Sequence, residues 1–279
     1  MNRAQRRQQE RANKKSQRAG SYQMEVEAMQ PWADVLMRVK LPQMVVDGML
    51  DITDQVLQDP DRKNWGDNLA GQIADEPLIP HELMQNYKIG KGGTVYNFFM
   101  DMVGKYVQHC TTQQATSVDL DRVKDIEWLT QMKSCWVISQ WEGEYNPIHI
   151  HTECQMSTVM YLKIPEFLPS TKPERDDDGN IMFIGGAGNP SQLTRNLLKV
   201  KPVVGDFFIF PAHLQHTVYP FKTDGDFERR SVSFNADFIN KQVLEDRQKQ
   251  EQEYQRQMQQ QTPPPIQGAP EKLTINTEA

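Results

Sequence analysis

The sequence predicts a mainly β domain of the α+β class, a sandwich or barrel with helices in its N-terminal part, and three observations support this. From Lys133 to about residue 240, short runs of β-branched and aromatic residues alternate with Gly, Pro and Asp. Segments with apolar residues at helical spacing come before them. The two ends of the chain are polar stretches for which no packed core is expected.

The N-terminal part of the domain is predicted to hold one strand and two helices. The alternating DVLMRVKLP, residues 34–42, predicts a strand, and QMVVDGMLDITDQVLQD, residues 43–59, predicts a helix. Residues 61–80 are rich in loop formers, and residues 92–115 predict a second helix. We expect the repeated apolar positions of that helix in the core: Val95, Phe98, Phe99, Met102, Val103, Tyr106 and Val107.

The C-terminal part of the domain is predicted to be a series of short strands. The acidic segment KPERDDDGN, residues 172–180, is expected to be a turn or loop between two of them, its Asp triplet more often a solvated tip than a cation site. The strands are expected within residues 134–141, 147–152, 157–165, 180–186, 197–211, 217–221 and 229–238.

Composition shifts set the expected boundaries. Residues 1–22 are predicted to be a disordered basic leader, because the first twenty carry seven Arg or Lys against one Glu. Residues 30–240 form the predicted domain, 241–261 an exposed Gln-rich helix and 262–279 a disordered tail. A solvated leader is the favoured interpretation, and a tether to nucleic acid or an acidic partner is the weaker alternative.

Charge and cysteine use limit the function classes. A net charge of −6 argues against general nucleic-acid binding by the whole domain. No run approaches the roughly 20 apolar residues of a membrane span, and the N-terminus lacks the apolar segment of a secretory signal. The three cysteines contain no CxxC pair, which favours a reducing compartment. We therefore expect a cytoplasmic protein.

The segment NPIHIHTEC, residues 146–154, places three potential metal ligands on alternate positions. On a β-strand, residues i, i+2 and i+4 point to one face, so His149, His151 and Glu153 would share a face. Imidazoles and carboxylates at this spacing can reach one metal ion, although the motif alone is a weak signal. A site would need a further ligand from elsewhere in the chain.

Two later segments strengthen the metal interpretation. VVGDFFIFPAHLQHTVYP, residues 203–220, has two histidines after a buried-looking strand, and we prefer His216 over His213 as the distal ligand. In ERRSVSFNADF, residues 228–238, alternation puts Arg229, Ser231, Ser233 and Asn235 on one face. An arginine and hydroxyls on such a face suit a carboxylate ligand.

Together these three segments resemble the 2-oxoglutarate- and Fe(II)-dependent oxygenases of the kind common in tailed phages and marine bacteria. The resemblance runs from about Leu36 to Phe238 and excludes both tails. It is carried by NPIHIHTECQMSTVMYLKIP, GDFFIFPAHLQHTVYP and ERRSVSFNADF, and NLAGQIADEPLIP is also similar to a family segment that precedes the core. The resemblance implies a double-stranded β-helix (jelly roll) fold. It also implies that the protein is located in the bacterial cytosol or in a phage-infected host.

The resemblance also implies the metal ligands. By position, His216 becomes the distal iron ligand and His151 a proximal one. His149 and Glu153 compete for the third place, because a His-x-Glu pattern and a cupin-like His-x-His pattern both fit. Related sequences more often have Gly at the position of Glu153.

The resemblance further implies how the small-molecule cosubstrate is bound. Arg229 would hold the far carboxylate of 2-oxoglutarate with help from Ser231, while Tyr161 would either hydrogen-bond the cosubstrate or lie in the core or rim. The implied activity is hydroxylation of a C–H bond in a substrate that the sequence does not identify.

Two other functions fit the same segments. One is a cupin-type metalloprotein without 2-oxoglutarate, with His149, His151 and His216 as ligands and Arg229 away from the pocket. The other is a jelly-roll interaction or particle-associated protein with no enzymatic activity. Convergence of His151, His216 and Arg229 on one cavity would separate them.

Overall fold

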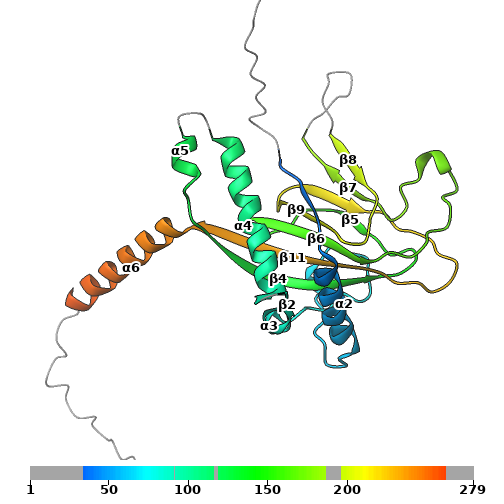
Figure 1. Cartoon of the computed structure of the whole chain (residues 1–279), viewed down its shortest axis with the longest axis horizontal. Helices are drawn as coiled ribbons and strands as arrows, with labels where there is room; N and C mark the ends of the chain where they lie inside the picture. The colour runs from blue at the N-terminus through cyan, green and yellow to red at the C-terminus, as the bar shows by residue number, and fades with distance from the viewer. Residues whose placement is uncertain (1–33, 91, 116–118, 187–195, 262–279) are drawn as a thin grey trace, which may run out of the picture. The chain divides into compact units, whose positions relative to one another are not determined.

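The computed structural model describes residues 34–90, 92–115, 119–186 and 196–261 (Figure 1). The elements below all lie in the compact unit that begins at Asp34. The basic leader, residues 1–22, and the C-terminal tail, residues 262–279, lie outside the described residues, so both remain predictions. No helix in the described part is long and apolar enough to cross a membrane.

Two antiparallel sheets form the body of this unit (Figure 1). The five-stranded sheet has the order β1-β9-β6-β11-β4, with bounds Met37–Lys40, Asp206–Pro211, Met156–Lys163, Arg229–Asn240 and Trp128–Gln140. The four-stranded sheet has the order β5-β10-β7-β8, with bounds Asn146–His149, Gln215–Val218, Ile181–Ile184 and Leu197–Val200. From β4 to β11 the chain passes repeatedly from one sheet to the other. The fold is a double-stranded β-helix, which confirms the expected class.

Helices cover the outer face of the five-stranded sheet. Both predicted helices form, as α2 (Gln43–Gln58) and α4 (Val95–Gln114), and Thr94 caps α4 by accepting a hydrogen bond from the Asn97 N–H. Phe99 of α4 packs edge-on against sheet residues, with its ring centroid 5.2 Å from that of Phe207. The predicted apolar positions of α4 all lie in or against this core. Smaller elements complete the layer: α3 (His81–Asn86), α5 (Leu120–Val123), β2 (Lys88–Ile89) and β3 (Gly93–Thr94).

A second core lies between the two sheets. Strand β6 is buried on both faces, because Met160 packs toward the helices while Val159 and Tyr161 pack toward the four-stranded sheet. This explains why its sequence is a nearly continuous apolar run rather than an alternating one. The inter-sheet core contains Val159, Tyr161, Ile181, Phe183, Phe208, Phe210, Leu214 and Val218.

The loop of residues 61–80 lies along the edge of β4. Isolated bridges pair Asp75 with Ser139 and Leu78 with Trp136, so the loop continues the sheet by a few residues. A further bridge joins Gln72 to Tyr145, just before β5. The loop therefore connects the edges of the two sheets and forms one wall of the space between them.

Two strand predictions are corrected in detail. The run of residues 147–152 does not form one strand, because β5 ends at His149. The run of residues 197–211 forms two strands, β8 and β9, separated by a turn in which Gly205 has φ of 83°.

The acidic segment is a loop with a short 3₁₀ helix, Pro173–Arg175. Another, Gly66–Asn68, lies in the 61–80 loop. Beyond β11, α6 (Lys241–Gln261) is mostly exposed along its described side chains.

Candidate functional site

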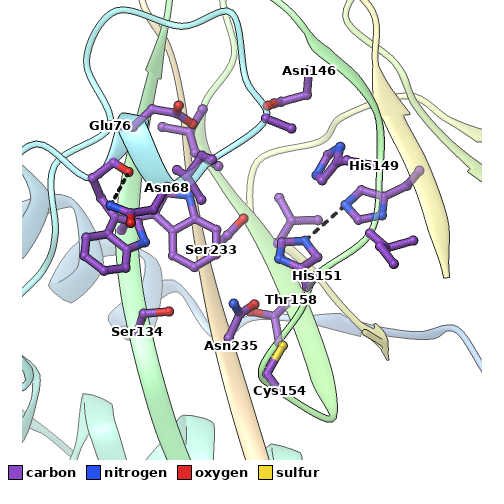
Figure 2. Close-up of a pocket in the computed structure, with 18 of the residues that line it drawn as sticks. Asn68, Glu76, Ser134, Asn146, His149, His151, Cys154, Thr158, Ser233 and Asn235 are labelled. Atoms are coloured by element: carbon purple, nitrogen blue, oxygen red, sulfur yellow. Dashed lines mark hydrogen bonds between the residues drawn. The ribbon is translucent and has the colours of Figure 1, made fainter. Parts of the chain in front are cut away.

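Three imidazoles meet between the sheets. His149 at the end of β5 is the register partner of His216 in β10, and His151 follows two residues later. The Nε2 atoms of His151 and His216 are 3.3 Å apart, and one ring nitrogen from each of the three histidines lies within 4.8 Å of the others (Figure 2). Two nitrogens bound at right angles about 2.1 Å from one metal ion are about 3 Å apart. The cluster therefore matches the geometry of a metal site.

Backbone carbonyls orient two of these rings. The Nδ1 atom of His149 lies 2.7 Å from the Pro147 carbonyl oxygen, and that of His216 lies 2.9 Å from the Leu214 carbonyl oxygen. A proton on each Nδ1 donates to the carbonyl and leaves the lone pair on Nε2 for a metal. His151 lies beyond the strand, where its N–H donates to the Ala212 carbonyl at 2.9 Å.

Burial keeps the three imidazoles neutral. Desolvation lowers the pKa of His151 to about 3 and that of His216 to about 4, and the neighbouring imidazoles add to both shifts. Desolvation also lowers the pKa of His149. Aromatic rings supply much of this dry environment, since Phe210 and Phe183 lie against His216, with centroid distances of 4.9 and 6.0 Å. Neutral imidazole is the form that binds metals.

Glu153 does not join the cluster. The expectation that one strand face carries it beside His149 and His151 is wrong, because β5 ends at His149. Glu153 has φ of 59° and an exposed side chain at the rim of the cavity, outside the group of converging ligand atoms. His213 also lies elsewhere, since its side chain is 72% exposed and its Nε2 lies 2.9 Å from Asp34 Oδ1.

The imidazoles open onto a cavity of about 510 Å³. Arg229, Ser231, Ser233 and Asn235 all line it, as the alternation of β11 predicted. His151, His216 and Arg229 therefore converge on one cavity, the arrangement that separates the metal-enzyme interpretations from an interaction protein. Strand β11 lies between β4 and β6 in the sheet. Across this pairing, Ser231 is the register partner of Ile138 and Tyr161, and Asn235 is the register partner of Ser134 and Ser157.

Arg229 is a buried cation without a buried anion. Its side chain is 1% exposed, and no carboxylate in the described part of the chain forms an ion pair with it. The Nη1 of Arg229 donates a hydrogen bond to Gln140 Oε1, while its Nε has no hydrogen-bond partner. Desolvation lowers the pKa of the guanidinium, which lies 5.2 Å from the Tyr161 ring centroid. The Tyr161 hydroxyl is buried next to this guanidinium and has no hydrogen bond of normal geometry among the described residues. Tyr161 belongs to the inter-sheet core and is not one of the residues that line the cavity.

Sequence reasoning missed one wall of the cavity. Trp65, Asn68 and Glu76 line it from the 61–80 loop, and Asn146 lines it from the start of β5. In Figure 2, Glu76 and Asn146 are drawn above His151, and Asn235 is drawn below it. No periodic pattern marked these residues, because the loop lies along the edge of β4 through isolated bridges instead of a regular strand. The available signal was NLAGQIADEPLIP, residues 68–80, which contains Asn68 and Glu76 and is similar to a family segment that precedes the core.

A family model described as "Putative 2OG-Fe(II) oxygenase" matches residues 134–235, from within β4 to within β11. This span contains the three imidazoles and Arg229. This segment of the chain is therefore similar to the 2-oxoglutarate- and Fe(II)-dependent oxygenases. The Fe(II) and 2-oxoglutarate of that family would suit a cavity that joins a cluster of imidazoles to an unpaired buried guanidinium.

Solved structures similar to this chain include three prolyl hydroxylases. The prolyl-4-hydroxylase of Pseudomonas putida is 14% identical, with 72% of this chain and 91% of that chain covered and a TM-score of 0.42. The prolyl hydroxylase of Trichoplax adhaerens, in complex with a hypoxia inducible factor peptide, is 13% identical, with 72% and 82% covered and a TM-score of 0.43. The viral collagen prolyl hydroxylase of Paramecium Bursaria Chlorella virus-1 is 14% identical, with 72% and 94% covered and a TM-score of 0.37. Among curated proteins no sequence matches the chain. These similarities leave the substrate open.

Proposed function

We propose that the protein is a 2-oxoglutarate- and Fe(II)-dependent oxygenase, in which His149, His151 and His216 hold the Fe(II) and Arg229 binds the distal carboxylate of 2-oxoglutarate. The observation that carries the proposal is the buried, unpaired guanidinium in the same cavity as the three imidazoles. Burying a cation without a counter-charge is costly, so a ligand carboxylate is the missing partner. The third protein ligand is then His149, and Glu153 is not needed.

The side chains around the cosubstrate position would orient it. Ser231 is buried beside Arg229 on the same strand face, and Tyr161 is its register partner on β6. The Nε of Arg229 has no hydrogen-bond partner and would donate to a carboxylate in the cavity. The Tyr161 hydroxyl lies behind Arg229 in the inter-sheet core, and it would reach such a carboxylate only where the carboxylate contacts the guanidinium. Two hydrogen bonds from the guanidinium and one from a hydroxyl would fix the far end of the cosubstrate.

The protein supplies geometry and a dry environment. Fe(II) bound with 2-oxoglutarate supplies the oxidative chemistry that hydroxylates a C–H bond of the substrate. Carbonyl-anchored Nδ1 atoms would hold the ligand rings in place, and the rings of Phe183 and Phe210 would keep water from that side of the cluster. Neutral ligands leave the metal with its full charge of two, which favours binding of a dianionic cosubstrate.

The cupin alternative shares the three-histidine cluster but assigns no role to Arg229. The lining of the cavity by Arg229 therefore favours the 2-oxoglutarate-dependent oxygenase. A cytoplasmic location in a bacterial or phage-infected cell is part of the same proposal, and the three free cysteines support a reducing compartment. A role for the basic leader in binding nucleic acid stays a prediction.

Calorimetry on anaerobic, metal-stripped protein tests the assignments. Fe(II) is titrated first and 2-oxoglutarate second, in the parent, His216→Ala and Arg229→Ala. We expect His216→Ala to lose iron binding, and Arg229→Ala to keep iron and lose 2-oxoglutarate. His213→Ala is the matched control, because His213 is exposed and is not one of the converging ligands. Iron binding without any 2-oxoglutarate binding in the parent would favour the cupin alternative, and absence of metal binding would contradict both.

A further inference from the structure

The cavity contains a second buried ionisable side chain, which the proposed chemistry leaves unused. Glu76 is 1% exposed and lines the same cavity as the three imidazoles. Its Oε2 atom is buried and accepts no hydrogen bond from the described residues. An ionised carboxyl is an acceptor at both oxygens, so burial without a donor is unfavourable unless something else offsets it.

The backbone of Glu76 holds this carboxyl in place. Its N–H donates to Asn64 Oδ1 at 3.2 Å, and its carbonyl accepts from the Trp65 N–H at 2.8 Å. The next residue, Pro77, accepts a hydrogen bond from the Val137 N–H of β4 at 2.9 Å. The loop is thus tied to the sheet on both sides of Glu76, and the side chain is directed into the cavity by a rigid support.

A second polar side chain lies in the same corner. A Cβ atom added to Gly71 would lie 2.6 Å from Asn146 Oδ1 and 3.0 Å from Glu76 Oε2, so both oxygens approach the same glycine. Asn146 is 9% exposed and lies three residues before His149 in β5. The corner therefore presents carboxyl and amide oxygens close together, and no described cation pairs with them.

Neither iron nor 2-oxoglutarate accounts for Glu76. Its oxygens are not among the converging ligand atoms of the three histidines. A carboxyl group also repels the carboxylates of 2-oxoglutarate, for which Arg229 already offers the complementary charge. The cavity thus has one buried cation and one buried acid that do not pair with each other, and each would suit a different molecule.

We propose that Glu76 is a specificity-determining residue that binds a basic nitrogen, an alkylammonium or guanidinium group, of the primary substrate. The inference rests on the proposed function, in which the three imidazoles hold iron and Arg229 holds 2-oxoglutarate, so that Glu76 is left for the substrate. A cationic donor matches an acceptor-rich corner better than a neutral donor does, because it also supplies the missing counter-charge.

Proton linkage supports the same assignment. Desolvation, with a smaller contribution from Glu144, raises the pKa of Glu76 to about 8. Asn146 and Gly71, which lie against the carboxyl, are uncharged. At pH 7 the empty cavity therefore holds mostly the protonated acid, and a cation that binds there displaces the proton. Binding of a basic probe is then accompanied by release of up to one proton.

The test uses the full chain loaded with Mn(II) and 2-oxoglutarate without oxygen. Four matched probes are titrated: n-butylammonium, n-butylguanidinium, 1-butanol and butyrate. Relaxation of the probe protons by Mn(II), compared with a Zn(II)-loaded sample, reports binding close to the metal. Calorimetry in buffers of different ionisation enthalpy counts the protons released. Glu76→Gln is the test variant, and Glu153→Gln is the control, because Glu153 is the other carboxylate that lines the cavity.

We expect the two cationic probes to bind the parent preferentially, to release protons at pH 7, and to bind Glu76→Gln at least tenfold more weakly. Glu153→Gln should match the parent within twofold, and both variants should retain the parent affinity for Mn(II) and 2-oxoglutarate. Gly71→Ala, which keeps the carboxyl but crowds it, should also weaken the cationic probes.

Three results would overturn the inference. These are equal binding of cationic and neutral probes, no binding of any cationic probe to the parent, and loss of Mn(II) affinity rather than probe affinity in Glu76→Gln. The last would mean that Glu76 balances the charge of the metal. Failure of the proposed function is a separate outcome, seen as absence of Mn(II) or 2-oxoglutarate binding in the parent. In that case the titration of metal-free protein, followed by chemical shifts and calorimetry, still decides whether Glu76 selects basic probes.

Discussion

Replacing Arg229 by Met separates a ligand-binding arginine from a structural one, because the two roles predict opposite changes in stability. A buried arginine paired with a protein carboxylate costs about 3–5 kcal/mol when removed, since the acid is left unpaired. Arg229 has no such carboxylate among the described residues. Its removal leaves only Gln140 Oε1 without its donor and Tyr161 without the cation over its ring.

The contributions to stability nearly cancel in the absence of cosubstrate. Loss of the hydrogen bond to Gln140 costs about 1–3 kcal/mol, and loss of the contact with Tyr161 costs about 0.5–2 kcal/mol. Relief of an unpaired buried charge returns several kcal/mol. We therefore expect the free energy of unfolding of the metal-loaded protein without 2-oxoglutarate to stay the same or rise by up to about 3 kcal/mol.

With 2-oxoglutarate the expected effect is reversed. At one hundred times Kd the cosubstrate stabilises the parent by about 2.7 kcal/mol. At roughly 2–4 °C for each kcal/mol in a domain of this size, Tm rises by roughly 5–11 °C. Loss of one partner of a buried charged pair costs about 2–5 kcal/mol of binding, so Kd rises by roughly 30-fold or more and most of the Tm shift disappears in Arg229→Met.

Scanning calorimetry on Mn(II)-loaded protein, with and without 2-oxoglutarate, measures both quantities. Arg122→Met is the matched control, because Arg122 is exposed on α5. It should keep the full shift caused by the cosubstrate. A fall of about 3–5 kcal/mol in the stability of Arg229→Met without cosubstrate, or an undiminished shift with it, would refute the reasoning.

Three further predictions concern other residues of the proposed site and its surroundings. His149→Ala should weaken Mn(II) binding at least tenfold in calorimetry, because His149 lies in the cluster. Glu153→Ala should weaken it by less than twofold, because Glu153 lies outside the cluster. A larger loss in Glu153→Ala than in His149→Ala would restore Glu153 as a ligand. Tyr161→Phe and Ser231→Ala should each raise the Kd of 2-oxoglutarate by roughly three- to tenfold, the worth of one hydrogen bond, while unchanged Kd values would exclude them from the site. Because the pKa of Glu76 is raised, the folded state binds more protons than the unfolded state between about pH 4.5 and 8. This residue therefore makes the free energy of unfolding fall as pH rises across that window. The fall amounts to about 1.4 kcal/mol for each unit by which the folded pKa exceeds the unfolded pKa. Glu76→Gln should remove that part of the decline in urea titrations at several pH values, and an identical decline in the variant would contradict the shift.

The local pattern of the chain determined most of the strands and helices. Apolar spacing located α4 and its core positions, since a helix face and its burial are both consequences of the 3.6-residue period. Alternation along β11 placed Arg229, Ser231, Ser233 and Asn235 on the cavity side, because successive side chains of a strand point to opposite faces of the sheet. The short range of these effects makes them visible in sequence.

Only the tertiary structure decided the composition of the site. Whether His149 or Glu153 joins His151 depended on where β5 ends, and that follows from its pairing with β10 rather than from the His-x-His-x-Glu spacing. The role of Glu76 was invisible, because its burial comes from a loop that pairs with the distant strand β4. Likewise, the lack of a protein counter-charge for Arg229 is a property of everything that surrounds it in space. Long-range pairing and burial set these features, and no local period in the sequence records them.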